Sequence, residues 1–221
     1  ASRVVIMIDG VRMNNLIYRA GHLQNIITID NSILDRVEIL NGSSSTMYGS
    51  DALGGVISMY TRKPLLQSTD KISLKGNAFF RYGLANNELT GHAEINIGLK
   101  KFASLTAVTY SKFGDLRMGG AQNPFYKKFG ERTFYADRID GNDTLITNNN
   151  PLIQKKSGYS QYDILQKFLI KQNDFLQHQL NIQFSNSTNI SRYDRLTDPK
   201  GNGLNSAEWY YGPQTRILTA Y

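Results

Sequence analysis

The sequence contains no cysteine, and it has only three histidines among its 221 residues. The absence of cysteine excludes a disulfide scaffold and a thiolate metal site. No segment approaches the roughly 18 consecutive apolar residues of a transmembrane helix, and no signal peptide is visible. The net charge is +7, yet no run of Lys and Arg is longer than two residues. This scattered distribution argues against a nucleic-acid partner.

The signatures of common enzyme classes are also missing. The Gly- and Ser-rich segment 42–49 has no Lys-Ser/Thr pair, so it is not a phosphate loop. Gly49-Ser50-Asp51 is not part of a G-x-S-x-G nucleophile turn. The histidines are too far apart in the sequence to match a metal-ligand motif. We therefore expect no catalysis, no catalytic cofactor and no metal site.

The first 64 residues combine short strands with turns. Val4 to Ile8 is an apolar run that ends in Asp9-Gly10, a dipeptide typical of hairpin turns. Asp30 is expected to cap a short helical turn. The other expected features are strands at Arg36 to Leu40 and Val56 to Tyr60, and a stop at Arg62-Lys63-Pro64, because proline ends ladder pairing.

From Lys71 onward, long segments alternate between apolar and polar residues. Such alternation places one set of side chains on each face of a strand. The clearest apolar face comprises Ile72, Leu74, Ala78, Phe80, Tyr82, Leu84, Leu89, Ala93, Ile95, Ile97, Leu99, Leu180, Ile182 and Phe184. Phe79 is an exception, because it stands among the polar positions. Segments near 102–113, 160–171 and 209–221 are also strand-like.

Strand and loop lengths favour a membrane barrel over a soluble β-sandwich. A strand of a dozen residues is about 40 Å long, whereas a tilted membrane strand needs only about ten residues. Connections at Lys100-Lys101 and 173–177 are short, but those at 114–158 and 193–207 are long and polar. Short turns at one end and long loops at the other are typical of outer-membrane barrels.

Four motifs, taken in order, resemble the plug domain of TonB-dependent outer-membrane receptors. They are Ile8-Asp9-Gly10, Asp35-Arg-Val-Glu-Ile-Leu-Asn-Gly42, Tyr48-Gly-Ser-Asp-Ala-Leu-Gly-Gly-Val-Ile57 and Arg62-Lys63-Pro64. The strands that follow resemble the start of the same family's barrel. A second resemblance is to the family's haem and haemoglobin receptors. It lies in Tyr159-Ser-Gln-Tyr-Asp163, Arg192-Tyr-Asp-Arg-Leu-Thr197 and Glu208-Trp-Tyr-Tyr-Gly-Pro213.

The resemblance implies a mainly all-β fold: a transmembrane antiparallel β-barrel, incomplete in this chain, with a small mixed α/β plug domain in its lumen. Residues 1–64 would be the C-terminal part of the plug, residues 65–70 a hinge, and residues 71–221 the first strands of the barrel, about six of them. It also implies a place in the bacterial outer membrane. The function would be TonB-dependent uptake of a scarce ligand, of the haem or iron–siderophore type.

The same resemblance implies the partners. The TonB–ExbB–ExbD complex would supply energy through a segment upstream of residue 1 and would rearrange the plug. Outer-membrane lipids and lipopolysaccharide would surround the barrel. A haemoprotein, or subunits of an outer-membrane complex, would be further partners. Haem or a ferric chelate would be transported cargo and not a catalyst.

Candidate site residues form two groups. The loop after Asp9-Gly10 is expected to touch cargo, with packing against the barrel as the alternative; its residues are Arg12, Asn14, Asn15, Tyr18, Arg19 and His22. The plug-motif positions with structural roles are Asp9, Gly10, Arg36, Glu38, Gly42, Tyr48, Gly49, Gly54 and Gly55.

One position departs from the family pattern. Many members have Arg-Gly-Pro after the strand at residues 36–40, where this chain has Asn41-Gly42-Ser43. That Arg commonly pairs with carboxylates of the barrel wall, so its absence puts the usual plug lock in question. Arg36 and Glu38 are alternative candidates, or else an ordinary exposed pair. Two other functions stay open: a scaffold barrel in an outer-membrane complex, and a soluble β-rich binding module.

Overall fold

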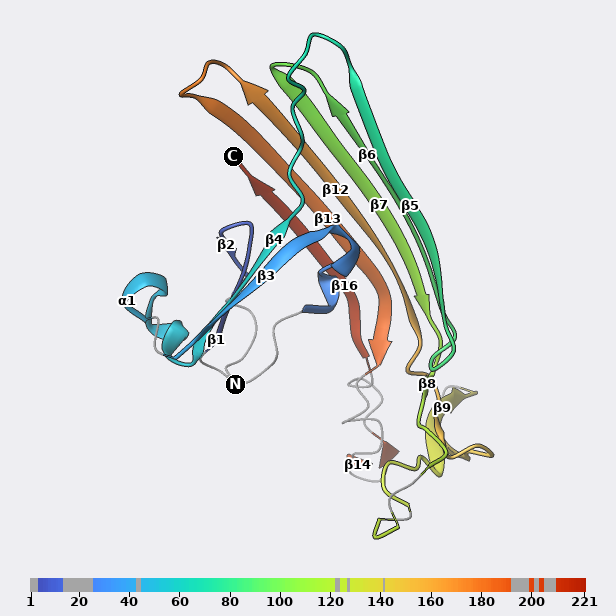
Figure 1. The fold of residues 1–221 in the computed structure, drawn as a ribbon. Helices are drawn as coiled ribbons and strands as arrows, with labels where there is room; N and C mark the ends of the chain where they lie inside the picture. The colour runs from blue at the N-terminus through green and yellow to red at the C-terminus, as the bar shows by residue number, and fades with distance from the viewer. Residues whose placement is uncertain are drawn as a thin grey trace.

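The computed structural model describes residues 4–13, 26–42, 45–121, 124–126, 128–140, 142–191, 199–200, 203–204 and 210–221. Two sheets dominate these residues, a four-stranded sheet near the N-terminus and a six-stranded sheet that follows it. We call residues 4–61 the plug and the six-stranded sheet the wall. Figure 1 shows the plug beside one face of the wall, whose strands are much longer. No described helix is long and apolar enough to cross a membrane.

The plug is a small mixed sheet in the order β2-β1-β4-β3. Strand β1 pairs with β4 in parallel and with β2 in antiparallel fashion, while β3 pairs with β4 in antiparallel fashion. Short helices connect the strands. The elements are β1 (Val4–Ile8), β2 (Val11–Arg12), η1 (Ile26–Thr28), η2 (Asn31–Ile33), β3 (Leu34–Asn41), α1 (Ser45–Tyr48), η3 (Ser50–Leu53) and β4 (Gly55–Thr61).

Local sequence signals explain the turns of the plug. Asp9 and Gly10 form a two-residue hairpin loop between β1 and β2, and both have positive φ values, +47° and +82°. This is the geometry that Asp-Gly favours, so the predicted turn is confirmed. The predicted cap is confirmed as well, because the Asp30 side chain accepts a hydrogen bond from the Ser32 N–H at the start of η2. Gly55 has a φ of +133°, and a Cβ there would lie 2.5 Å from the Leu40 carbonyl oxygen.

The wall is an antiparallel sheet in the order β16-β13-β12-β7-β6-β5. Its strands contain 11 to 15 residues, well above the usual five or six. They are β5 (Ser73–Gly83), β6 (Glu88–Gly98), β7 (Phe102–Phe113), β12 (Tyr159–Lys171), β13 (Gln177–Ser191) and β16 (Tyr210–Ala220). The predicted fold class, mainly β with an unclosed barrel wall, is confirmed.

Connections at the two ends of the wall differ in length. Turns 99–101 and 172–176 lie at one end, and the long connection 114–158 extends from the other (Figure 1). That long connection has structure of its own, and further short strands lie between β13 and β16. These elements are β8 (Leu116–Arg117), β9 (Phe134–Ile139), β10 (Asn142–Thr147), β11 (Ile153–Gln154), β14 (Pro199–Lys200) and β15 (Gly203–Leu204). The four-residue turn 84–87 shares the end that carries the long connection.

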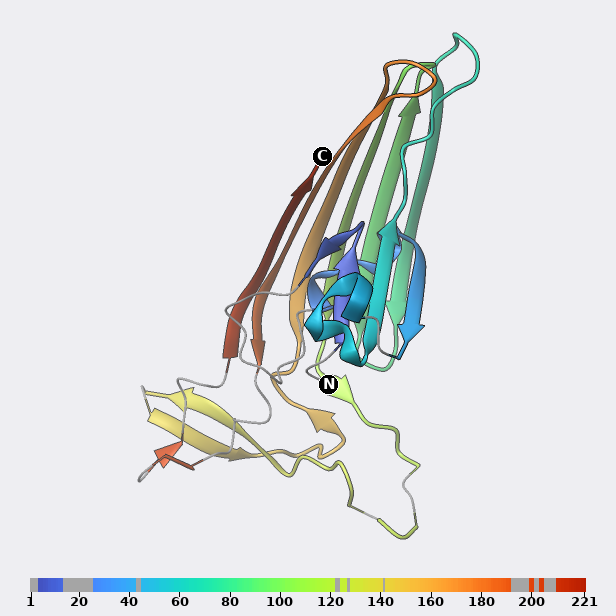
Figure 2. The ribbon, with the colours of Figure 1, turned by 90° about the vertical axis from the view of Figure 1, so that its left-hand side faces the viewer.

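Burial in the wall is inverted relative to a soluble sheet. On β6, the apolar side chains of Leu89, Ile95 and Ile97 are exposed, while Thr90 and His92 are buried. The buried side chains face the plug, which lies in front of the wall in Figure 2. Phe79, the exception in the sequence pattern, stacks on His92 with ring centroids 5.0 Å apart. An apolar outer face with a polar inner face is the arrangement of a membrane barrel.

This pattern predicts that a charged side chain on the outer face strongly destabilises the folded protein in a membrane. Ile164 lies near the middle of β12, opposite Val108 and Phe184. Ile164→Lys in the full-length protein should lower the free energy of unfolding from phospholipid vesicles by about 2–4 kcal/mol. Guanidinium unfolding measures this change. Leu145→Lys, in the exposed hairpin β9–β10, is the matched control, and equal losses at the two positions would contradict the assignment of the outer face.

Candidate functional site

The contact between the plug and the wall is centred on the carboxylate of Asp9. Its Oδ1 accepts a hydrogen bond from the Thr61 N–H at 2.8 Å, and its Oδ2 accepts one from Thr61 Oγ1 at 2.6 Å. From the wall, Asn181 Nδ2 donates to Oδ2 at 2.8 Å and Gln183 Nε2 donates at 3.0 Å. Lys167 Nζ forms an ion pair with the same oxygen at 3.0 Å. One side chain therefore joins β4 of the plug to β12 and β13 of the wall.

The wall side of this contact is almost completely dry. The exposed fraction of Lys167 is 1%, that of Asn181 is 2% and that of Gln183 is 0%. Lys167 Nζ also donates a hydrogen bond to the Thr61 carbonyl oxygen at 3.4 Å. A buried ammonium without a counter-charge is strongly unfavourable. Asp9 is therefore the group that makes the burial of Lys167 possible.

The environment of Asp9 also sets its ionisation. Burial by itself would favour the neutral acid, but the hydrogen bonds from Thr61 and the charge of Lys167 outweigh burial. The pKa of Asp9 is consequently below its usual value of 3.8. The backbone of Asp9 is in the left-handed region, where Asp is tolerated better than most residues. A charged, donor-saturated carboxylate thus sits on a turn that holds it toward the wall.

A second polar contact lies at the start of η2. Asp30 accepts a hydrogen bond from Thr109 Oγ1 of β7 through a short contact. The Thr109 hydroxyl oxygen lies 2.7 Å from His92 Nδ1 on β6. Since the Thr109 hydrogen is directed to Asp30, its oxygen accepts from His92 Nδ1. Nearby, Arg216 Nε on β16 donates to the Thr28 carbonyl oxygen at 3.1 Å.

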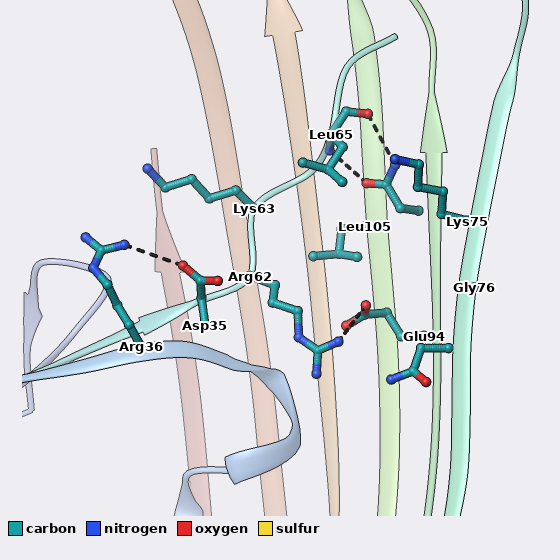
Figure 3. Close-up of a pocket in the computed structure, with 11 residues that line it drawn as sticks. Asp35, Arg36, Arg62, Lys63, Leu65, Lys75, Gly76, Glu94 and Leu105 are labelled. Carbon is teal, nitrogen blue, oxygen red and sulfur yellow. Dashed lines mark hydrogen bonds and ion pairs between the residues drawn. The ribbon is translucent and has the colours of Figure 1, made fainter.

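A third contact follows the end of β4. Arg62 Nη1 donates to Glu94 Oε1 on β6 at 2.8 Å, and Arg62 also reaches the Ser32 carbonyl oxygen. The Leu65 N–H and carbonyl oxygen both pair with the Asn96 side chain, at 2.8 and 3.2 Å. Between these two bridges lies a cavity of about 450 Å³. Figure 3 shows Arg62 reaching across to Glu94 beneath it.

The wall also has small apolar contacts with the plug. Ile33 packs with Leu105, Ala107 and Leu165 of the wall. Leu218 of β16 packs against a group of plug residues, namely Ile6, Ile8, Ile29 and Met59. Polar and ionic contacts accompany these apolar clusters across the described plug–wall interface.

The predicted substitutes for the missing lock Arg do not reach the wall. Arg36 Nε donates to Glu38 Oε1 at 2.7 Å, and the Arg36 guanidinium lies 3.9 Å from the centre of the Tyr60 ring. The hydrogen bond from Arg36 lowers the pKa of Glu38. Both side chains are about half exposed, so they form the ordinary exposed pair that was the alternative.

The other predicted positions are distributed over the plug. Arg12 pairs with Asp51 within the plug. Gly42 and Gly49 have φ values of +93° and +88°, and Tyr48 packs beside Val5, Ala52 and Val56. Gly54 ends η3. The predicted cargo contacts Asn14, Asn15, Tyr18, Arg19 and His22 lie outside the described residues, as do residues 192–197 and 208–209 of the second resemblance.

Sequence reasoning missed the pairing of Asp9 with Lys167. A signal was present, because Lys167 stands on the inward face of β12 with Gln161, Asp163 and Leu165. A lone cation on such a face requires an acidic partner. The described residues contain no group of three or more His, Asp or Glu that could hold a metal ion. The arrangement holds the plug against the wall.

Comparisons with known proteins bear on both parts of the chain. Residues 1–56 match the family TonB-dependent Receptor Plug Domain. The chain is 34% identical over 135 residues to Heme/hemopexin utilization protein C of Haemophilus influenzae strain 86-028NP. This match covers 58% of this chain and 18% of that protein. The protein of the same name from another Haemophilus influenzae strain is 39% identical over 77 residues, 34% of this chain and 10% of that protein. The chain thus spans less than a fifth of either relative.

Solved structures agree on the fold. Two mutants of the ferric enterobactin receptor from Pseudomonas aeruginosa, both in complex with enterobactin, match 99% of this chain and 30% of their own. Their TM-scores are 0.58 and 0.60, at 12% and 13% identity. The predicted resemblance is therefore confirmed: residues 1–56 match the plug domain of TonB-dependent receptors, and the fold of the chain is a plug segment followed by strands of a barrel wall.

Proposed function

We propose that the protein containing this chain takes up haem across the bacterial outer membrane, energised by TonB. The observation that carries this proposal is the 34% identity with Heme/hemopexin utilization protein C over 135 residues, a longer stretch than the plug alone. A ferric siderophore is the second cargo class. It rests on a likeness of fold to the enterobactin receptors and not on close sequence identity.

The proposed mechanism requires a plug that is stable at rest and mobile under force. Outer loops and plug tips capture the cargo, and the TonB–ExbB–ExbD complex pulls on the plug to open a path. Most plug–wall hydrogen bonds are exchanged for bonds to water as the plug moves, at a net cost of about 0.5–1.5 kcal/mol each. The Asp9–Lys167 pair is the stronger attachment, because a hydrogen-bonded pair of charged groups is stronger than a hydrogen bond between neutral groups.

Transport of this kind makes and breaks no covalent bond in the cargo. The protein needs no catalytic residue for it, and haem is a passenger. Lipids and lipopolysaccharide contact the apolar outer face of the wall, and a haemoprotein that delivers haem is the proposed external partner. The missing lock Arg favoured the alternative function as a scaffold barrel. The Asp9 contact weakens that argument, because it attaches the plug to the wall through an acid on the plug and a lysine on the wall.

Growth on haem tests the proposed function. Cells that depend on the full-length protein and receive haemin as their iron source should grow, and loss of TonB should abolish that growth. Ferric enterobactin supplied in parallel distinguishes the second cargo class. Normal growth on haemin without TonB would exclude energised haem import by this protein.

The attachment through Asp9 predicts a non-additive effect of two substitutions. Asp9→Asn keeps the shape and the left-handed turn but leaves Lys167 without a counter-charge, so the free energy of unfolding should fall by about 3–5 kcal/mol. Adding Lys167→Met removes the buried charge and should recover much of that loss. Chemical unfolding of the four proteins in the double-mutant cycle measures the coupling, with Arg36→Gln as an exposed control. Strictly additive losses would disprove the coupling.

The lowered pKa of Asp9 predicts an acid-sensitive contact. A carboxyl whose pKa is depressed by folding stabilises the folded state above its unfolded pKa, and this stabilisation is lost as the pH falls through the folded pKa. The stability gap between the unsubstituted protein and Asp9→Asn should therefore be constant from pH 7 to pH 5 and narrow below about 3.8. Melting temperatures across this range measure the gap. A gap that widens with acid would contradict the sign.

A further inference from the structure

The wall donors around Asp9 form a compact group, which we call the carboxylate cradle: Lys167 Nζ, Asn181 Nδ2 and Gln183 Nε2. All three converge on Asp9 Oδ2 at 2.8–3.0 Å. All three side chains are at least 98% buried. One ammonium and two amide donors around a single oxygen form a site that recognises a carboxylate.

The carboxylate cradle is held in shape by the wall itself. Lys167 and Asn181 are directly opposite each other in the ladder of β12 and β13. Gln183 Oε1 accepts a hydrogen bond from Arg216 Nη1 on β16 at 2.8 Å, and Gln183 Nε2 lies 3.3 Å from Asn181 Oδ1. These contacts do not involve the plug, so the two amide donors keep their positions when Asp9 leaves, while Lys167 stays opposite Asn181 through the strand ladder.

Withdrawal of the plug would leave the carboxylate cradle with an uncompensated positive charge. Lys167 has one ion pair among the described residues, and Asp9 is its partner. The nearest acid on the same face of β12 is Asp163, four residues away, which is about 13 Å along a strand. An empty cradle therefore attracts an anion of the same chemistry as Asp9.

We propose that the carboxylate cradle is a binding site for a carboxylate group of the cargo, and that Asp9 occupies it as an internal substitute while the plug is at rest. This inference rests on the proposed function and specifies its cargo as a carboxylate-bearing chelate. Haem has two propionate groups that meet this requirement. Exchange of one carboxylate for another keeps Lys167 paired with a carboxylate as Asp9 leaves.

Chemical rescue tests the carboxylate cradle without any cargo. Asp9→Gly empties the cradle, and glycine suits the φ of +47° at this position. Acetate should raise the melting temperature of full-length Asp9→Gly more than chloride at equal ionic strength. The difference should vanish in Asp9→Gly/Lys167→Met. Equal effects of acetate and chloride would overturn the inference.

Transport of haemin and of its dimethyl ester tests the role in passage. Uptake per bound molecule should be about tenfold faster for haemin than for the ester in the unsubstituted protein, as expected for loss of a charged hydrogen bond. Lys167→Met should remove this preference without changing the affinity for haemin at the cell surface. Lys112→Met, an exposed residue of β7, is the matched control and should keep the preference.

The outcomes separate the two proposals. If Lys167→Met keeps the preference for haemin over its ester, cargo does not use the carboxylate cradle, whatever acetate does. If the unsubstituted protein imports no haemin, haem uptake itself is rejected. The acetate experiment then still decides whether the carboxylate cradle binds carboxylates.

Discussion

The buried ion pair between Asp9 and Lys167 is the constraint on which the plug–wall arrangement depends. Lys167 is 1% exposed and has a single charged partner among the described residues, so its ladder position is compatible with folding only when Asp9 reaches it. The turn after β1 and the parallel pair β1–β4 place Asp9 where it meets this requirement. The other polar side chains on the inner face of the wall also depend on contacts with the plug. Its buried Thr, Asn, Gln and Ser side chains need partners, and plug atoms supply several of them.

The two faces of the wall are suited to different surroundings. Its outer face carries exposed Ile, Leu, Phe and Tyr side chains that water would not tolerate as a continuous patch. Its inner face carries polar groups that lipid would not tolerate. The strands satisfy both demands by strict alternation, so a shift of one residue in the register would place every side chain in the wrong medium. The pairing of Lys167 with Asp9 therefore depends on the same register that keeps the outer face apolar.

Much of the fold followed from local patterns, because those patterns report interactions between near neighbours. The alternation in β5, β6 and β13, the Asp-Gly turn and the Asp30 cap were all predicted. The pairing of Asp9 with Lys167 was not, because 158 positions separate the two residues and their approach depends on how the plug docks. The missing Arg after β3 directed attention to Arg36 and Glu38, which pair with each other instead. The spacing of residues in the sequence does not show which turn of the plug an inward-facing lysine of the wall will contact.

An attachment through one carboxylate has consequences for release that a broad apolar interface lacks. The apolar clusters across the interface contain few residues, and each one costs free energy to expose in proportion to its apolar area. Ordinary hydrogen bonds are exchanged for water bonds at low net cost. Resistance to movement is thus concentrated where Asp9 holds Lys167, Asn181 and Gln183. The left-handed backbone of Asp9 stores a small amount of strain at the same point. In the proposed mechanism, force or an anion that takes the place of Asp9 therefore acts mainly on this contact.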